Sequence, residues 1–216
     1  MEDLARLFRL CLDAQYIHTA EEASFAVRSD VGRLLILFQH SSGARDWENN
    51  LDFPAVPYSG MPQNWRCHRG FLRAWKSALP FIAEVLAETS YKKITIVGYS
   101  HGAALAVLCH EYIWFRRPDL RAELRGYGFG APRAVWCVAG CRPLSVRWEN
   151  FTVVRNLDDA VTHLPPRLLG YRHMGTMLTI GEKGRYTPLD AHRPESYLAS
   201  LEEHARLTDS GARSPF

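Results

Sequence analysis

The chain has 216 residues, of which 47% are hydrophobic, and its 26 basic and 23 acidic side chains leave a formal net charge of +3. This length and hydrophobic content suit one sizeable core, so we expect residues 1–216 to form a single domain. The nearly balanced charge is scattered along the chain, which argues against the basic footprint of a nucleic-acid-binding protein.

The N-terminal stretch MEDLARLFRLCLDAQYIHTA repeats apolar residues at helical spacing: Leu4, Leu7, Phe8, Cys11 and Leu12. This pattern predicts an amphipathic helix and not a signal peptide. No apolar run approaches the roughly 20 residues that a membrane span needs. We therefore expect a soluble, cytoplasmic protein without a transmembrane segment.

The five cysteines are an odd number, and none belongs to a C-x-x-C pair of the kind that binds zinc. We expect reduced, mostly buried thiols. Cys137 and Cys141 leave the alternative of a small disulfide-closed loop in CVAGC, although the spacing alone carries little information.

Strands and helices are expected to alternate along the rest of the chain. Ser24–Arg28 and Arg33–Phe38 have the pattern of a hairpin, with its turn at residues 29–32. The run 69–89 has helical periodicity, and Pro80 is expected to bend or restart that helix. The later elements are a strand at 94–97, a helix from Ser100 to about Phe115, strand-like runs within 124–130, 150–156 and 171–180, and a closing helix around Glu195–Leu207. This order predicts an α/β protein with a mostly parallel sheet and helices on both faces.

The stretch VGYSHGAALA places a serine between two glycines at the turn from a strand into a helix. The pattern Gly-x-Ser-x-Gly, here Gly98–Gly102, is typical of a nucleophile elbow, because a sharp strained turn needs neighbours without side chains. We interpret Ser100 as a catalytic nucleophile. The alternative is an ordinary helix start with Ser100 as its N-cap.

A serine nucleophile needs a base and an acid that orients the base, in the order Ser, Asp or Glu, His for α/β-hydrolases. Asp158 and Asp159 follow the predicted strand FTVVRN and are both candidates for the acid. The histidines beyond them are His163, His173, His192 and His204. His163 is too near Asp159 in sequence, and His204 lies on the last predicted helix. His68 precedes the serine and is expected to be a packed core residue.

Five motifs, in the same order, resemble those of the class 3 lipase family from about Arg33 to Leu201. They are LFQHSSGARDW, CHRGFLRAW, VGYSHGAALA, GFGAPR and DDAVTHLPP. The resemblance implies an α/β-hydrolase fold that hydrolyses carboxylic esters. It also implies the triad Ser100, Asp159 and His192, where His192 lies in DAHRPESYL, and it favours Asp159 over Asp158 and His192 over His173.

The resemblance further implies an oxyanion hole formed by Ser41, at the family's Thr/Ser position, and by the backbone N–H of His101. The chain departs from the family pattern at Gln39–His40, Tyr99 and His101, which changes the walls around the scissile bond but removes no catalytic atom. The segment 40–65, with Phe53, Val56, Tyr58, Met61 and Trp65, is expected to be either a short lid over the pocket or ordinary surface packing.

The expected substrate is therefore a lipid or another apolar acyl ester, with transient contact to a lipid interface and with no metal ion or organic cofactor. Two other functions fit the same residues. A thioesterase or feruloyl-type esterase would share the triad and differ in pocket shape. A non-catalytic binding module on this fold would be expected to lose a triad member.

Overall fold

The structure is a computed structural model that describes residues 3–21, 23–39, 54–58, 65–87, 91–137 and 146–209. The described α-helices are α1 (Leu4–Leu12), α3 (Arg69–Ala87), α4 (His101–Arg116) and α5 (Pro194–Asp209). Short 3-10 helices include η1 (Pro118–Glu123), η3 (Val161–His163), η4 (Arg167–Leu169) and η5 (Asp190–His192). The described strands are β1 (Ile17–His18), β2 (Ser24–Asp30), β3 (Arg33–Gln39), β4 (Ala55–Pro57), β5 (Arg66–His68), β6 (Lys93–Tyr99), β7 (Leu124–Phe129), β8 (Val135–Trp136), β9 (Phe151–Asn156), β10 (Tyr171–Arg172) and β11 (Thr176–Ile180).

The main sheet has seven strands in the order β1-β2-β3-β6-β7-β9-β11. Strands β3, β6, β7, β9 and β11 pair in parallel, whereas β1, β2 and β3 pair antiparallel. The prediction of a mostly parallel sheet is therefore confirmed. Because the carboxyl ends of parallel strands share one edge, the segments that follow β6, β7 and β9 meet there.

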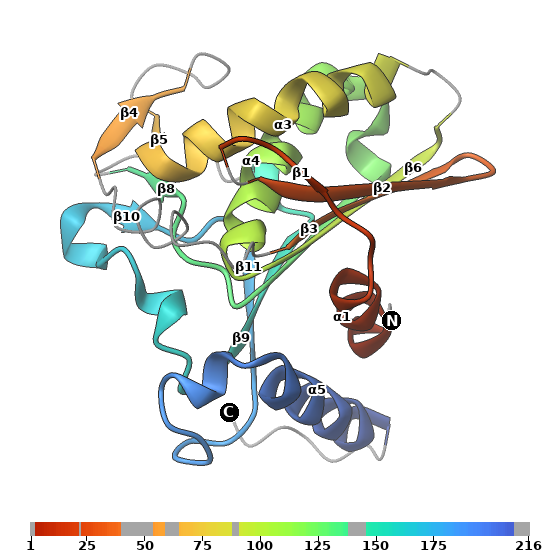
Figure 1. Ribbon diagram of the computed structural model, residues 1–216. Coiled ribbons are helices and arrows are strands. Elements are labelled where there is room, and N and C mark those ends of the chain that lie inside the picture. Colours follow the sequence, from red (N-terminus) through yellow and green to blue (C-terminus); the bar gives the residue numbers. More distant parts are fainter. Residues whose placement is uncertain are drawn as a thin grey trace.

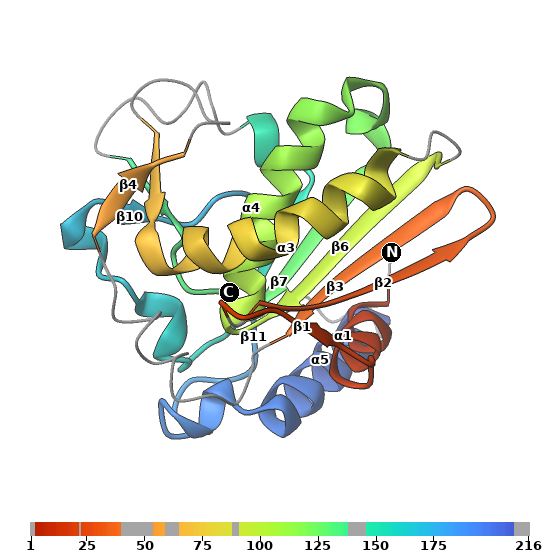
Figure 2. The ribbon, with the colours of Figure 1, turned by 45° about the horizontal axis from the view of Figure 1, so that its top comes forward.

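Helices cover both faces of this sheet. Figures 1 and 2 show α3 and α4 on one face and α1 and α5 on the other. Two buried apolar clusters lie between these layers, one formed with α3 and α4 and the other with α1 and α5. A small antiparallel sheet, in the order β10-β8-β5-β4, lies beside the first turn of α3.

The elements depart from expectation at several places. The strand-like run 171–180 is divided into β10, in the small sheet, and β11, in the main sheet. The β2–β3 turn is shorter than predicted, because strand pairing continues to Asp30↔Arg33 and Gly32 adopts φ +68°. Helix α3 runs through Pro80 without a restart, since the segment is one helix from Arg69 to Ala87.

The cysteines only partly follow expectation. Cys11, Cys67 and Cys109 are free and buried, as expected. Cys137 is disulfide-bonded, so the expectation of a reduced thiol is wrong there. In the described ranges, no helix combines the length and apolar character needed to cross a bilayer. The single-domain organisation stays a prediction.

Candidate active site

Ser100 occupies a strained turn between β6 and α4. Its backbone has φ 56° and ψ −126°, and it is the one described residue other than glycine with positive φ. A Cβ on Gly98 would lie 2.4 Å from the carbonyl oxygen of Gly102, and a Cβ on Gly102 would lie 2.5 Å from the backbone of Phe38. Both glycines of the motif are therefore required by close backbone packing, which holds Ser100 at the sheet edge.

The structure brings Ser100, His192 and Asp159 into one hydrogen-bonded chain. His192 Nε2 lies 2.8 Å from Ser100 Oγ, and His192 Nδ1 lies 2.8 Å from Asp159 Oδ2. Asp159 is fully buried, Ser100 is 8% exposed, and the His192 side chain is 17% exposed. Such a chain of nucleophile, base and orienting acid can transfer a proton away from the serine hydroxyl.

The carboxylate of Asp159 is held by two further donors. The Tyr197 hydroxyl donates to Oδ2 at 2.6 Å, and the backbone N–H of Val161 donates to Oδ1 at 2.9 Å. The same hydroxyl accepts from the backbone N–H of Asn156 at 3.1 Å. Burial and the Asp159 charge raise the pKa of Tyr197 well above its ordinary value, so this residue stays a donor. These bonds compensate for burying the carboxylate.

The segment that carries His192 is fixed at neighbouring atoms. The Tyr99 hydroxyl donates to the carbonyl of His192, and the two rings stack with centroids 5.4 Å apart. Asn156 Nδ2 donates to the carbonyl of Ala191 at 2.9 Å. These contacts come from the ends of β6 and β9, so the strands that place the serine and the acid also orient the base.

Gly130, which follows β7, leaves the space that the triad needs. A Cβ at this residue would lie 2.9 Å from His192 Cε1 and 3.2 Å from Asp159 Oδ2, and its φ is +60°. Sequence reasoning assigned no role to Gly130, Tyr197 or Asn156. The first two lie inside the quoted motifs GFGAPR and DAHRPESYL, which is the signal that could have identified them.

The competing acid and base candidates lie elsewhere. Asp158 accepts from the backbone N–H of Gly184 at 2.6 Å, and His173 Nε2 lies 2.8 Å from the carbonyl oxygen of Thr162. Burial lowers the pKa of His173 to about 4, which favours a neutral structural histidine. His163 is exposed at the end of η3.

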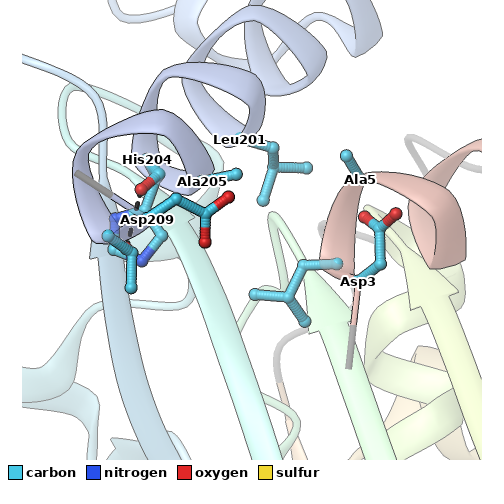
Figure 3. Close-up of a pocket in the computed structure, with 8 residues that line it drawn as sticks. Asp3, Ala5, Leu201, His204, Ala205 and Asp209 are labelled. Carbon is cyan, nitrogen blue, oxygen red and sulfur yellow. Dashed lines mark hydrogen bonds between the residues drawn. The ribbon is translucent and has the colours of Figure 1, made fainter. Parts of the chain in front are cut away.

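The two other histidines weighed as candidates, His68 and His204, have surroundings of a different kind. His68 is buried and stacks on Phe71 at 4.0 Å, as expected for a core residue. His204 lines a cavity of about 360 Å³ between α1 and α5 that no triad residue lines (Figure 3).

The oxyanion-hole prediction is only half covered by the described residues. His101 is the first residue of α4, and its buried side chain packs on Phe71 with ring centroids 5.3 Å apart. Backbone N–H groups in a first helical turn lack acceptors within the helix and lie at its positive end. Ser41 lies outside the described residues.

The segment 40–65, expected to be a lid or surface packing, is described only at residues 54–58 and 65. Tyr58 and Trp65 are buried, Trp65 stacks on Trp148 at 4.9 Å, and Tyr58 accepts from the indole N–H of Trp75. These two side chains therefore belong to the buried core, and the lid over the pocket stays a prediction. Phe53 and Met61 lie outside the described residues.

Across the described ranges, no group of three or more histidine, cysteine, aspartate or glutamate side chains is arranged to hold a metal ion. The elbow, the hydrogen-bonded triad and the mostly parallel sheet together define an α/β-hydrolase fold with a serine-hydrolase site. Residues 35–169 match the family described as "Lipase (class 3)". The chain belongs to the class 3 lipase family.

Individual relatives support this membership. The chain is 31% identical to a lipase of Rhizomucor miehei over 148 residues, which cover 66% of this chain and 40% of that protein. It is 26% identical to the secreted mono- and diacylglycerol lipase LIP1 of Malassezia globosa over 161 residues, covering 73% and 52%. A solved triacylglycerol lipase, described as having a serine protease triad as its catalytic centre, superposes with a TM-score of 0.67 at 28% identity, covering 78% of this chain and 66% of that one. The chain thus spans about half the length of the curated relatives that it matches.

Proposed function

We propose that this chain is a serine carboxylic-ester hydrolase acting through Ser100, His192 and Asp159. The observation that carries the proposal is the pair of 2.8 Å contacts that link Ser100 Oγ to His192 and His192 to Asp159. The triad acid is buried and accepts three hydrogen bonds, which is the arrangement needed to orient a base and to offset its positive charge.

Catalysis follows from this geometry in two halves. His192 Nδ1–H donates to Asp159, which leaves Nε2 to accept the proton of Ser100 as Oγ attacks the ester carbonyl. The tetrahedral intermediate then collapses, and the His192 imidazolium gives its proton to the departing alkoxide, so the alcohol leaves and an acyl-enzyme remains. In the second half, His192 takes a proton from water, the hydroxide attacks the acyl carbonyl, and the proton returns to Ser100 as the acid leaves.

Two donors are proposed for the developing oxyanion. The backbone N–H of His101 opens α4, and that helix directs its positive end to the elbow. The backbone N–H of Ser41, and in addition its hydroxyl, is proposed from the family resemblance as the second donor. Donors fixed before charge develops stabilise the transition state because they need no reorganisation.

The proposed substrate is a lipid or another apolar acyl ester. Support comes from the relatives, which are named as a lipase and as a mono- and diacylglycerol lipase. A panel of p-nitrophenyl esters of increasing chain length, beside an emulsified triacylglycerol and a matched acyl thioester, measures the preference directly. Rates that rise with chain length support the lipid ester. A preference for the thioester would favour the thioesterase alternative.

The nucleophile is tested with Ser100→Ala and a fluorophosphonate probe. The probe should label Ser100 in the wild type, and the variant should stay folded with kcat lowered by as much as about 10⁶-fold, the scale seen when a triad serine is removed. Folded wild type that neither labels nor turns over any ester would overturn the proposal in favour of a non-catalytic binding module.

The acid and the base are each tested against a neighbour that the structure places elsewhere. Asp159→Asn should lower kcat by about 10⁴-fold, as loss of the orienting carboxylate does in serine proteases. Asp158→Asn is the matched control, since that side chain binds Gly184 and not His192, and it should keep kcat. In the same way, kcat/KM should fall far more in His192→Ala than in His173→Ala. Equal losses within either pair would contradict the assignment.

A further inference from the structure

Three leucines are exposed on the segment that connects β9 to β10. Leu164, Leu168 and Leu169 are 43%, 99% and 53% exposed. Figure 1 shows η4, which carries the last two, as a light-blue turn at the outer edge of the molecule beside β10. Scattered exposed leucines are ordinary, but three exposed leucines within six residues concentrate apolar side chains on one short segment, which needs an explanation.

The backbone beneath these leucines is fixed. The backbone N–H of Arg133 donates to the carbonyl of Leu164 at 2.7 Å, and the indole N–H of Trp136 donates to the carbonyl of Leu169 at 2.8 Å. Gly170 ends η4 with φ +91°, and a Cβ there would lie 2.5 Å from Trp136 Nε1. The leucine side chains are therefore presented to the outside by a well-bonded turn.

A cluster of arginines accompanies the leucines. The Arg172 guanidinium donates to the carbonyl of Arg167 at 2.7 Å, and the Arg133 guanidinium donates to the carbonyl of Pro165 at 2.8 Å, so these cations lie on the segment that carries the leucines. Partial burial and the charges of Arg167, Arg172 and Arg155 lower the pKa of Arg133. Within the described ranges, no carboxylate forms an ion pair with any of them. The hydrogen bonds of Arg133 and Arg172 go to backbone carbonyls, which leave their positive charge uncompensated. The cluster is thus suited to a multiply anionic partner.

Trp136 adds an amphipathic side chain to the same region. It is partly exposed, and the guanidinium of Arg66 lies 5.7 Å from the centre of its ring. An indole at the boundary between apolar and charged groups is characteristic of side chains at lipid–water interfaces.

The patch begins a few residues after the triad acid. Asp159 binds the backbone of Val161 at the start of η3, and Leu164 follows only five residues after Asp159. Five residues of extended chain span at most about 18 Å, so Leu164, where the patch begins, lies within that distance of the triad acid. A surface that contacts Leu164 would therefore lie on the same part of the chain as the triad acid.

We propose that this region, here called the leucine–arginine patch (Leu164, Leu168, Leu169, Arg133, Arg167 and Arg172), binds the surface of a lipid assembly that carries anionic headgroups. The leucines enter the boundary between headgroups and acyl chains, and the guanidiniums bind headgroup phosphates. The choice of a lipid surface over a protein partner rests on the proposed function. The preference for anionic lipid rests on the unpaired arginines.

Vesicle co-sedimentation of the full chain tests this proposal. The vesicles are made of ether-linked phosphatidylcholine alone or mixed with ether-linked phosphatidylglycerol, so that ester cleavage cannot alter them. We expect the chain to bind the anionic vesicles about 10-fold more tightly, or more, than the phosphatidylcholine vesicles, since each basic residue near the surface contributes about 5-fold. This binding should weaken with added salt. Equal affinity for the two vesicles would overturn the proposal.

Two patch variants and two matched controls locate the contact. Leu168→Asp should weaken binding about 10-fold or more, the usual effect of losing one buried leucine, and Arg167→Glu should weaken anionic binding about 20-fold. Val31→Asp and Arg6→Glu make comparable changes, an exposed apolar residue to aspartate and an exposed arginine to glutamate, on the β2–β3 turn and on α1. Figure 2 places that turn on the opposite side of the molecule from η4. The controls should bind as the wild type does.

The outcomes separate this inference from the proposed function. Patch variants that bind vesicles as the controls do would overturn the assignment of lipid binding to the patch. A Leu168→Asp variant that dissociates a dimer of this chain but leaves vesicle binding unchanged would overturn it as well, because a second copy would then cover the leucines. Vesicle selectivity in a protein that hydrolyses no ester would refute the proposed function and keep the patch. A protein that hydrolyses esters but binds both kinds of vesicle equally would keep the proposed function and refute the patch.

Discussion

Replacing Gly130 by alanine separates backbone strain from disturbance of the triad, because the chain offers a matched control. Gly130 has φ +60°, and a Cβ there would lie 2.9 Å from His192 Cε1 and 3.1 Å from His192 Nδ1. Gly184 has a similar φ of +78°, but a Cβ there meets nothing within 4 Å. Gly130→Ala and Gly184→Ala therefore share the strain of a left-handed backbone and differ in the collision with His192.

The expected magnitudes follow from these contacts. A left-handed backbone costs an alanine about 1–2 kcal/mol, which lowers Tm by about 2–8 °C for a chain of this size in both variants. In Gly130→Ala the His192 ring must also retreat from 2.9 Å to an ordinary contact of at least 3.4 Å. A displacement of about 0.5–1 Å in a catalytic group lowers kcat by about 10- to 100-fold.

The assay combines thermal unfolding with steady-state hydrolysis of a soluble p-nitrophenyl ester. Gly184→Ala should lose stability and keep kcat, whereas Gly130→Ala should lose both. The reasoning is refuted if Gly130→Ala keeps kcat within about 3-fold of wild type, well inside the expected loss. It is equally refuted if Gly184→Ala loses as much activity.

Three further outcomes are expected. Tyr197→Phe removes a donor to Asp159 and leaves the buried Asn156 N–H without its acceptor. The free energy of unfolding should therefore fall by about 2–4 kcal/mol, and kcat should fall as well. An unchanged urea midpoint would contradict this expectation. Burial lowers the pKa of His173 to about 4 in the folded state, against 6.5 for the free side chain. As the pH falls from 6.5 towards 4, the unfolded state therefore takes up the proton first, and the free energy of unfolding falls by up to about 3 kcal/mol. His173→Gln should flatten that dependence in urea titrations at several pH values, and an identical slope would exclude His173 as its source. Ser41→Ala should lower kcat by about 10- to 1,000-fold at little change in KM if the hydroxyl donates to the oxyanion.

Much of the fold and the elbow could be predicted because their causes are local. Runs such as LLILF and ITIV are short and apolar, and ITIV is rich in β-branched residues, which favours buried strands, and the order of elements predicts a parallel sheet. At the elbow, Gly98 and Gly102 are needed by the turn in which Ser100 sits, so three residues within five positions carry the information.

The acid and the base could not be chosen by local patterns alone. Asp158 and Asp159 are adjacent and chemically equal, and the resemblance to a family was needed to favour one of them. In the structure the two carboxylates point to different partners, Gly184 for the first and His192 for the second. Likewise, His173 and His192 both follow the acid in sequence, and only the tertiary fold places one of them against Ser100.

The sequence by itself determined the alternation of strands and helices, the strained serine and the set of candidate partners, because strand patterns and glycine-dependent turns are encoded within a few residues. The tertiary structure alone decided which carboxylate and which imidazole meet the serine, and that Tyr197 and Gly130 support them. Ser100 and His192 are 92 positions apart in sequence. Their contact exists because β6, β7 and β9 lie side by side in parallel, so the segments after these strands converge at one edge of the sheet.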